Sequence, residues 1–374
     1  MSIMSRCVFV AAVLLVIPSV RMHAQTVAAK PAATTPGSPA ESGADDYRTN
    51  PKFVDAMKEA KRFEHQRRAS FAADDYKKAN KIAGGQCFEC LQGLYHTQMM
   101  QGSYKDAIAT TMALEALAVG PVTKSTALYY RGSALAAKAG DKPKSAELEA
   151  AHGAFQESIS LYPKNVAALF SDGKVLAQLG RMDDARGDFQ RCLSCVSPTD
   201  PARLRAEHFA DDPELSTHKM APPFEVTAMD GTKFNLDAMG GRVVLIDFWA
   251  TWCEPCNREL PHMKKIAKEF ANDPLVIISV SWDNDEAKWK DFVAKNEMTW
   301  VQYRDEDHSL SDDFGINAIP HYFTIDSDGV LTAEMLGEDS DVEGKLKKLI
   351  TKEKAAKAQA RDVRSADAVA TAGN

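Results

Sequence analysis

The stretch "GRVVLIDFWATWCEPCNRELPHMKKIAKEF", residues 241–270, joins two kinds of hydrophobic pattern. Residues 241–250 form a nearly continuous apolar run, which is typical of a central β-strand buried on both faces. Four apolar residues then recur at helical spacing: Leu260, Met263, Ile266 and Phe270. We therefore expect a buried strand followed directly by an amphipathic helix, with Cys253 and Cys256 where the two elements meet.

The sequence after this stretch continues with alternating strand and helix patterns. A second buried strand, a helix, a short strand and a closing helix are expected at 275–282, 285–296, 299–305 and 342–354. Between the last two elements, "HYFTID" and "GVLTAEMLG" flank the turn signal Ser327-Asp328-Gly329 and predict a β-hairpin. Strand–helix–strand followed by an antiparallel hairpin and a helix indicates a mixed α/β sheet.

Cys253 and Cys256 stand at the predicted start of a helix. Unpaired backbone N–H groups and the helix dipole stabilise an anion there, so Cys253 should favour the thiolate. Cys256, one turn later, should lie more deeply buried, with its Cα roughly 5 Å from that of Cys253. Pro255 suits a first helical turn because its missing N–H would have no partner. Zinc would require two further ligands, and no second cysteine pair lies in this part of the chain. The pattern predicts a reversible dithiol/disulfide couple.

Four segments of this region resemble the thioredoxin superfamily, and within it the TlpA/ResA-like extracytoplasmic thioredoxins. They are "APPF" (221–224), "DGTKFNL" (230–236), "GRVVLIDFWATWCEPCNRELPHM" (241–263) and "AIPHYFTIDSDG" (318–329). The strand and helix expected between 275 and 296 match the insertion that distinguishes this branch from plain thioredoxin. The resemblance implies an α/β thioredoxin fold over residues 217–352.

The resemblance also implies roles for individual residues. Cys253 would attack a target disulfide and form a mixed disulfide, which Cys256 would resolve. Pro320 matches a cis-proline that faces the active site, and the backbone before it pairs with the bound substrate chain. Trp252, Ile319 and Pro320 are therefore the expected substrate-binding residues.

Two acidic residues and one histidine complete the predicted site. Asp247 lies inside the apolar strand, so its pKa should be raised, and it matches the buried acid that accepts a proton from the second cysteine. The alternative is a strand-end Asp held by hydrogen bonds. Glu259 matches an active-site Glu of the "CEPC" branch, with a solvated helix carboxylate as the alternative. We expect His321 to be a partly exposed spacer rather than a group that tunes the thiolate or contacts substrate.

Residues 51–199 predict an all-α region with an internal repeat. Two copies of a helical-hairpin pattern place Leu, Gly, Tyr, Ala and Phe at tetratricopeptide spacings, in "LQGLYHTQMMQGSYKDAIATTMALEAL" and "LFSDGKVLAQLGRMDDARGDFQRCL". A longer copy between them contains Leu128, Gly132, Ala151 and Phe155, and a degenerate hairpin precedes all three. Stacked copies bury a continuous core that one hairpin cannot. This region resembles the tetratricopeptide repeat family; a generic helical bundle is the alternative.

Two further cysteine pairs, Cys87/Cys90 and Cys192/Cys195, lie in this helical region. They stand two repeats apart, too far for one tetrahedral zinc site when packed helices are about 8–10 Å apart. Neither pair follows a strand beside a proline, so catalysis is not expected of them. We expect structural disulfides, with packed thiols as the alternative.

The N-terminus has the pattern of a secretory signal over residues 1–24. Arg6 supplies the positive charge, residues 7–20 are apolar, and Ala24 can end the cleaved piece. We therefore expect an exported protein, periplasmic or otherwise extracytoplasmic. Met22 is a poor residue at the −3 position of the cleavage site, so an uncleaved N-terminal membrane anchor is the alternative.

Three other segments are too polar or too short to form a core of their own. Residues 25–50 are rich in Ala, Pro, Thr and Ser and predict a flexible linker. Residues 200–216 are expected to be a second linker. The Ala-rich, charged segment 353–374 is expected to be a disordered tail.

The net charge of −7, from 45 Lys and Arg against 52 Asp and Glu, gives no case for nucleic-acid binding. No Gly-rich dinucleotide turn follows a strand, so no nicotinamide or flavin cofactor is expected. The sequence predicts a thiol–disulfide oxidoreductase that reduces disulfide-bearing exported proteins, with a membrane thiol reductant as electron donor and a protein partner for the repeats. A repeat-based binding scaffold with an incidental redox pair is one alternative. A peroxidase is another, although Ala250 stands where peroxiredoxins have Thr.

Overall fold

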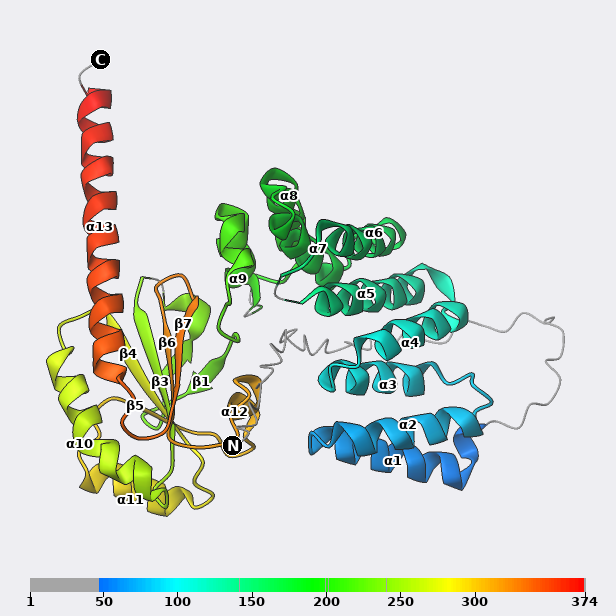
Figure 1. The fold of residues 1–374 in the computed structure, drawn as a ribbon, viewed down its shortest axis with the longest axis horizontal. Helices are drawn as coiled ribbons and strands as arrows, with labels where there is room; N and C mark the ends of the chain where they lie inside the picture. The colour runs from blue at the N-terminus through cyan, green and yellow to red at the C-terminus, as the bar shows by residue number, and fades with distance from the viewer. Residues whose placement is uncertain (1–46, 141, 199, 201, 240, 373–374) are drawn as a thin grey trace, which may run out of the picture. The chain divides into compact units, whose positions relative to one another are not determined.

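Strand β3 (Val243–Trp249) forms the centre of the C-terminal unit because all of its residues are buried and only Asp247 among them is polar. The computed structural model describes residues 47–372 apart from 141, 199, 201 and 240. In it, β3 occupies the middle of a five-stranded sheet (Figure 1). Helix α10 (Glu254–Glu269) follows, which confirms the predicted strand and helix.

The sheet has the strand order β5-β4-β3-β6-β7. Strand β4 runs parallel to β3 and β5, whereas β6 runs antiparallel to β3 and β7. The bounds are Leu275–Ser281 for β4, Val301–Arg304 for β5, His321–Ile325 for β6 and Leu331–Leu336 for β7. A separate antiparallel pair, β1 (Glu225–Thr227) with β2 (Lys233–Asn235), precedes them. This is the mixed α/β thioredoxin fold that the sequence predicts.

Alternate residues of β3 enter two hydrophobic cores on opposite faces of the sheet. Val244, Ile246 and Phe248 pack with Phe323 of β6 and with Leu310 of the short helix α12 (Ser309–Asp313). On the other face, Val243 and Leu245 pack with α10 and with α13 (Val342–Ala372). The two helices therefore cover the face of the sheet toward which Asp247 also points, because strand residues two apart share a face.

The segment expected to be a linker, 200–216, contains two short helical elements. They are α9 (Ala202–Asp211) and a 3₁₀ helix, η2 (Pro213–Thr217). Buried Arg205 binds α9 to the rest of the C-terminal unit: Nε donates to Oδ1 of Asp237 at 2.8 Å and Nη1 donates to the carbonyl oxygen of Ala221 at 2.7 Å. The expectation of a linker here was wrong because these buried contacts fix the segment.

Helix α13 continues to Ala372, where a disordered tail was expected from residue 353. The residues after 352 are mainly Ala, Lys, Arg, Glu and Gln, all of which have high helix propensity, and no Pro or Gly interrupts them before Gly373. The helix therefore extends beyond the expected domain end.

The N-terminal unit consists of helices that pack in sequence order as antiparallel pairs (Figure 1). Their bounds are Pro51–His65 for α1, Ala69–Ile82 for α2, Phe88–Met100 for α3, Tyr104–Leu117 for α4, Gly120–Ala139 for α5, Ser145–Leu161 for α6, Val166–Gln178 for α7 and Met182–Cys195 for α8. A one-turn helix, η1 (Tyr47–Thr49), precedes α1. The pair α1 and α2 occupies the position of the predicted degenerate hairpin.

Two glycines explain how closely the paired helices approach. A Cβ atom added at Gly132 would lie 2.6 Å from the ring of Phe155, and one added at Gly173 would lie 2.7 Å from the ring of Phe189. Both distances are shorter than van der Waals contact allows. Each glycine therefore admits the aromatic ring of the following helix, as the repeat pattern predicts for small residues at a helix crossing.

The two cysteine pairs of this unit differ. Cys87 and Cys90 form a disulfide, whereas Cys192 and Cys195 are thiols. Cys87 is the N-cap of α3 and has extended backbone angles, but both cysteines of the second pair lie within α8. The prediction of a disulfide was therefore wrong for Cys192 and Cys195. The Cys192 thiol is buried instead and donates to the carbonyl oxygen of Val166 at 3.9 Å.

The chain divides into two compact units, Met1–Cys195 and Val196–Asn374. The predicted signal (1–24) and most of the predicted linker (25–50) lie outside the described residues. Among the helices that the structure describes, none combines the length and hydropathy needed to cross a membrane.

Candidate functional site: a disulfide at the start of helix α10

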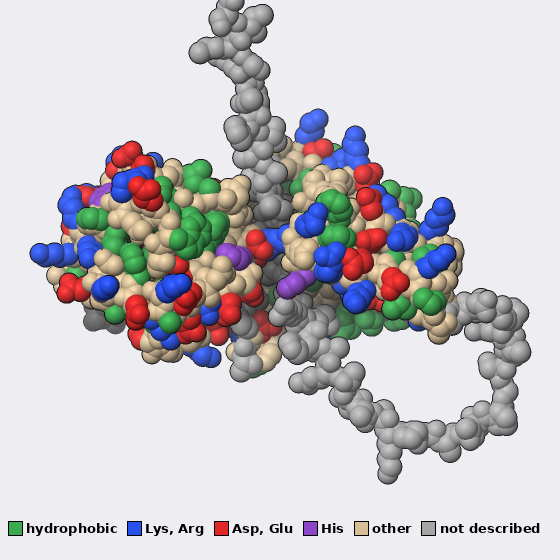
Figure 2. Space-filling view, turned by 90° about the horizontal axis from the view of Figure 1, so that it is seen from below, with side chains coloured by type: hydrophobic (Ala, Val, Ile, Leu, Met, Phe, Trp, Pro, Cys, Tyr) green, Lys and Arg blue, Asp and Glu red, His purple; other side chains and the backbone are tan. Residues whose placement is uncertain are grey.

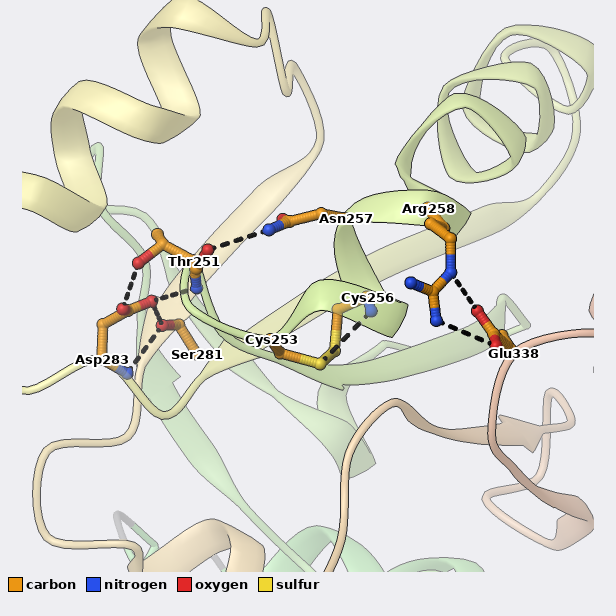
Figure 3. The surroundings of a disulfide bond; sticks show 8 residues. All are labelled: Thr251, Cys253, Cys256, Asn257, Arg258, Ser281, Asp283 and Glu338. Carbon is orange, nitrogen blue, oxygen red and sulfur yellow. Dashed lines mark hydrogen bonds and ion pairs between the residues drawn. A yellow bond between two sulfur atoms is a disulfide. The ribbon is translucent and has the colours of Figure 1, made fainter.

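Cys253 and Cys256 lie where β3 ends and α10 begins, and they are joined by a disulfide (Figure 3). Cys253 is the N-cap residue, and its Sγ accepts the backbone N–H of Cys256 at 3.2 Å. The two Cα atoms are 5.3 Å apart, as the spacing predicts. Pro255 occupies the first helical turn, where an absent N–H costs nothing. After reduction, the same N–H and the helix dipole would stabilise a thiolate on Cys253.

The two cysteines are buried to nearly the same extent, with exposed fractions of 5% for Cys253 and 7% for Cys256. The expectation that Cys256 is the more buried one is not met. Both belong to a hydrophobic cluster with Trp249 and with Trp289 of helix α11 (Glu286–Lys295), against which Ile319 also packs. The disulfide therefore has apolar groups around both sulfur atoms.

Asp247 lies in the middle of β3 with an exposed fraction of 5%. Burial raises the pKa of its carboxyl to about 7, and the charge of Glu259 acts in the same direction. The hydroxyl of Ser279 donates to Oδ2 at 2.8 Å and opposes the rise. The structure thus agrees with the burial and the raised pKa predicted from the sequence. The bond from Ser279 also fits the alternative interpretation, a strand-end Asp held by hydrogen bonds.

A small cavity of about 10 Å³ separates Asp247 from the disulfide. Its walls include Asp247, Cys256, Asn257, Leu260, Met263 and Tyr322. A cavity of this size is close to the minimum that holds one water molecule. Asp247 and Cys256 therefore border the same space, across which a single water could carry a proton between them.

Glu259 lies in a different hollow, with a volume of about 550 Å³, between α10 and the start of α13. Its Oε2 is 3.1 Å from Nδ1 of His262, and its Oε1 accepts the backbone N–H of Asp339 at 3.5 Å. The Glu259 side chain is 17% exposed. Glu259 is thus a tethered carboxylate beside the site, neither freely solvated nor part of the cavity behind Cys256.

The predicted substrate-binding residues differ in how they lie relative to the disulfide and in how exposed they are. The peptide bond between Ile319 and Pro320 is cis, as the resemblance implies. Ile319 packs against the cluster that contains both cysteines. Trp252 directly precedes Cys253 and is 63% exposed. Figure 2 shows apolar side chains gathered on one face of the C-terminal unit.

His321 is not the partly exposed spacer that the sequence analysis expected. It is 6% exposed, its ring stacks on Phe323 with centroids 4.9 Å apart, and Nε2 is 3.2 Å from Oε1 of Glu334. Burial lowers the pKa of the imidazole, against the opposite effect of Glu334. As a residue of β6, it faces the sheet core that contains Phe323.

A network around the cysteines was missed by the sequence analysis. Asp283, after the end of β4, accepts hydrogen bonds from the backbone N–H and the hydroxyl of Thr251, at 2.9 and 2.5 Å. Asn257 Nδ2 donates to the carbonyl oxygen of Thr251 at 3.0 Å (Figure 3). Asp283 follows the carboxyl end of β4, which runs parallel to β3. Because the carboxyl ends of parallel strands lie at the same edge of a sheet, this position could have indicated that Asp283 lies near the cysteines.

Arg258 joins α10 to the loop after β7 at the surface of the site. Its guanidinium binds Glu338 through Nε at 2.7 Å and Nη2 at 3.0 Å (Figure 3). Nη1 binds Glu254 of the "CEPC" motif at 2.9 Å. The first turn of α10 is thereby connected to the loop after β7. Within the described part of the chain, no group of three or more His, Cys, Asp or Glu side chains is arranged to hold a metal ion.

Comparisons with known proteins agree with this geometry. The Redoxin family profile matches residues 216–350. The thiol-disulfide oxidoreductase ResA of Bacillus thuringiensis is 32% identical over 143 residues, which are 38% of this chain and 83% of that protein. The chain belongs to the ResA-like family of thiol–disulfide oxidoreductases.

Two further proteins are similar to part of this chain. The thioredoxin-like protein YneN of Bacillus subtilis is 32% identical over 116 residues, 30% of this chain and 67% of that protein. Among solved structures, a thiol-disulfide oxidoreductase from Bacteroides fragilis is 26% identical, with 35% of this chain and 99% of that chain covered and a TM-score of 0.33. The Redoxin match lies wholly within the C-terminal unit, so the oxidoreductase function belongs to that unit.

Proposed function

We propose that this oxidoreductase reduces disulfides in exported proteins through Cys253 and Cys256. The observation that carries the proposal is the position of Cys253, whose sulfur accepts a backbone N–H at the start of α10. A thiolate there is stabilised, and a stabilised thiolate at neutral pH is the attacking species in thiol–disulfide exchange.

The exchange proceeds in two steps. The Cys253 thiolate attacks one sulfur of the target disulfide, a Cys253–target bond forms, and the other target sulfur leaves as a thiolate. Asp247 then takes the proton of the Cys256 thiol across the small cavity, and the Cys256 thiolate attacks the Cys253 sulfur. The second target thiolate leaves, and the Cys253–Cys256 disulfide seen in the structure remains. Two electrons have passed to the target.

The disulfide must be reduced again before another cycle, and a dithiol of a membrane reductant is the proposed donor. The reducing direction is the one that the resemblance to ResA-like proteins implies. The N-terminal sequence supports export, because Arg6 is followed by an apolar segment, residues 7–20. Outside the cytoplasm protein thiols are oxidised, so a reducing enzyme requires a source of electrons from the membrane.

The helical unit is proposed to recruit a protein partner. Its surface includes three exposed apolar residues that a partner could cover: Met112 at 67%, Val119 at 86% and Val122 at 52% exposed. Stacked helical hairpins also present an extended surface whose side chains vary without loss of the fold.

Insulin reduction tests the redox proposal. The full chain, supplied with dithiothreitol, should accelerate the precipitation of insulin chains, and Cys253→Ser should remove the acceleration. Cys192→Ser, a buried thiol of the helical unit, is the matched control and should leave the rate unchanged. Equal rates for wild type and Cys253→Ser would reject the proposal. Fractionation of the expressing cell tests export separately: recovery of the protein only with cytoplasmic markers would reject the extracytoplasmic role.

A further inference from the structure

The four residues before α10 form a turn that determines the position of the reacting sulfur. The backbone N–H of Cys253 donates to the carbonyl oxygen of Ala250 at 3.1 Å, which closes a β-turn over Thr251 and Trp252. The exposed indole of Trp252 stands at its tip. A turn moves more freely when no side chain binds it, and Cys253 would move with it.

Asp283, two residues beyond the end of β4, binds this turn. Its carboxylate accepts three hydrogen bonds: from the Thr251 N–H at 2.9 Å, the Thr251 hydroxyl at 2.5 Å and the Ser281 hydroxyl at 2.7 Å. The backbone N–H of Asp283 donates in turn to the Ser281 oxygen at 3.0 Å. Asp283 is 4% exposed. A buried carboxylate is costly without partners, and charge-assisted hydrogen bonds of this number offset the cost and fix the geometry.

Asn257 holds the same residue from the opposite side. Its Nδ2 donates to the Thr251 carbonyl oxygen at 3.0 Å, while its backbone N–H donates to the Cys253 carbonyl oxygen at 3.0 Å. Thr251 is therefore bound through its N–H and hydroxyl to the segment directly after β4 and through its carbonyl to α10 (Figure 3). Both anchors must stay in place for the Cys253 sulfur to keep its 3.2 Å contact with the N–H of Cys256.

We propose that Asp283 is a positioning residue for the nucleophile, which acts through Thr251 to align Cys253 with the target disulfide. The proposal rests on the proposed function of Cys253. In exchange the attacking, central and leaving sulfur atoms must lie nearly in line, so a small displacement of the turn reduces the rate. Alkylation also needs an in-line approach, but a small, freely tumbling electrophile can reach the sulfur from any open direction, so its rate depends less on the exact position of Cys253. The two reactions therefore respond differently to loss of the anchor.

The experiment measures both reactions in the full-length chain with a Cys256→Ser background, in which attack is not followed by resolution. Rates of mixed-disulfide formation with insulin and of Cys253 alkylation by iodoacetamide are followed to high pH, where each reaches a plateau because the thiolate is fully formed. Mass spectrometry of the peptide that contains Cys253 gives both rates. The variants are Asp283→Asn, Thr251→Val and Thr251→Ser, with Asp285→Asn as the matched control.

Asp283→Asn and Thr251→Val should lower the insulin plateau about tenfold and change the iodoacetamide plateau less than about twofold. Thr251→Ser keeps the hydroxyl and should restore the insulin plateau. Asp285 caps α11 and is exposed, and Asn caps equally well, so its variant should match wild type. The inference is overturned if the insulin plateau of Asp283→Asn and Thr251→Val is unchanged, or if both reactions slow equally. It is also overturned if the insulin plateau of Thr251→Ser is as low as that of Thr251→Val. If the background protein and the Asp285 control do not react with insulin at all, the proposed function fails instead.

Discussion

The hydroxyl of Ser279 donates a hydrogen bond of 2.8 Å to Oδ2 of Asp247, between directly paired positions of β4 and β3. The Ser279 oxygen also accepts the indole N–H of Trp300 at 2.7 Å. The bond lowers the pKa of Asp247, but burial outweighs it and the pKa stands at about 7. Asp247 can therefore both accept and release a proton near neutral pH, which is what a general base for Cys256 requires.

The raised pKa makes the C-terminal unit less stable at high pH. The folded protein keeps the Asp247 proton up to about pH 7, whereas an unfolded Asp loses it near its ordinary value of 3.8. Stability therefore falls as the pH rises from about 4 to about 7 and is level above that. We expect Asp247→Asn to raise the free energy of unfolding of the oxidised protein by roughly 2–4 kcal/mol at pH 8, with little gain at pH 4.

Urea unfolding followed by tryptophan fluorescence measures this effect in the full chain. All five tryptophans lie in the C-terminal unit, so the signal reports that unit alone. Asp285→Asn, at the exposed N-cap of α11, is the control and should leave stability unchanged at both pH values. An equal gain for Asp247→Asn at pH 4 and pH 8 would show that removal of the charge is not the cause.

The two acids should differ in their effect on resolution. Asp247 borders the cavity behind Cys256, whereas Glu259 lies in the hollow beside His262. We predict that Asp247→Asn slows the attack of Cys256 on a mixed disulfide more than Glu259→Gln does, with a smaller effect on the first attack by Cys253. Stopped-flow exchange with a model disulfide between pH 5 and pH 9 separates the steps. If only Glu259→Gln shifts the resolution profile, Glu259 is the proton acceptor and the ranking is wrong.

The two cysteines should give opposite results when replaced. Cys253→Ser should abolish exchange because the nucleophile is absent. Cys256→Ser should accumulate covalent complexes with target proteins because the resolving thiol is absent. Non-reducing electrophoresis of each variant, expressed in cells and quenched with acid, detects the complexes, and mass spectrometry identifies their partners. Full turnover in either variant would contradict the assignment.

The fold could be predicted from the sequence where a local pattern of apolar and polar residues was compatible with only one structure. A polar residue inside an apolar strand, as at Asp247, must be buried, and its pKa must rise. Helical spacing after Cys256 likewise placed the cysteines at a helix N-terminus. These conclusions needed no knowledge of which distant residues come into contact.

The rest depended on such contacts. The pairs Cys87/Cys90 and Cys192/Cys195 have the same spacing, but only the first begins at an N-cap with an extended backbone. Asp283 looked no different from Asp285 in "WDNDEA", because nothing local shows that one turns inward to Thr251 while the other caps a helix. Whether Asp283 or Asp285 is buried depends on the contact with Thr251, a residue distant in the sequence.

The disulfide between Cys87 and Cys90 should contribute to the stability of the helical unit but not to exchange. Both residues are buried, and Cys87 also caps α3 through the N–H of Cys90 at 3.1 Å. We expect the double Ser variant to lower the melting temperature, measured by circular dichroism at 222 nm, and the insulin reduction rate to stay within about threefold of wild type. The Cys192→Ala, Cys195→Ala variant should have the smaller thermal effect, because no cross-link is lost. A loss of exchange as large as that of Cys253→Ser would mean that electrons pass through the helical unit.

A pair of buried carboxylates makes the helical unit sensitive to pH as well. Asp172 of α7 is fully buried and is bound by Nδ1 of His152 at 2.7 Å, while Asp188 of α8 is 5% exposed and is bound by Arg191 at 2.9 Å. Burial, followed by the negative charge of Asp172, raises the pKa of Asp188 to about 6, and Arg191 opposes the rise.

The folded unit therefore holds the Asp188 proton at pH values where the unfolded chain has lost it, and stability falls between about pH 4 and about pH 6. We predict that Asp188→Asn removes this fall and raises stability at pH 7 by about 1 kcal/mol, less than the full shift implies because the Arg191 partner is half exposed to solvent. Circular dichroism at 222 nm, with tryptophan fluorescence to subtract unfolding of the other unit, measures it. Asp183→Asn, an exposed residue in the first turn of the same helix, is the control. If the pH dependence survives in Asp188→Asn, the titrating group lies elsewhere, because Asn in place of Asp188 leaves no proton there to be released.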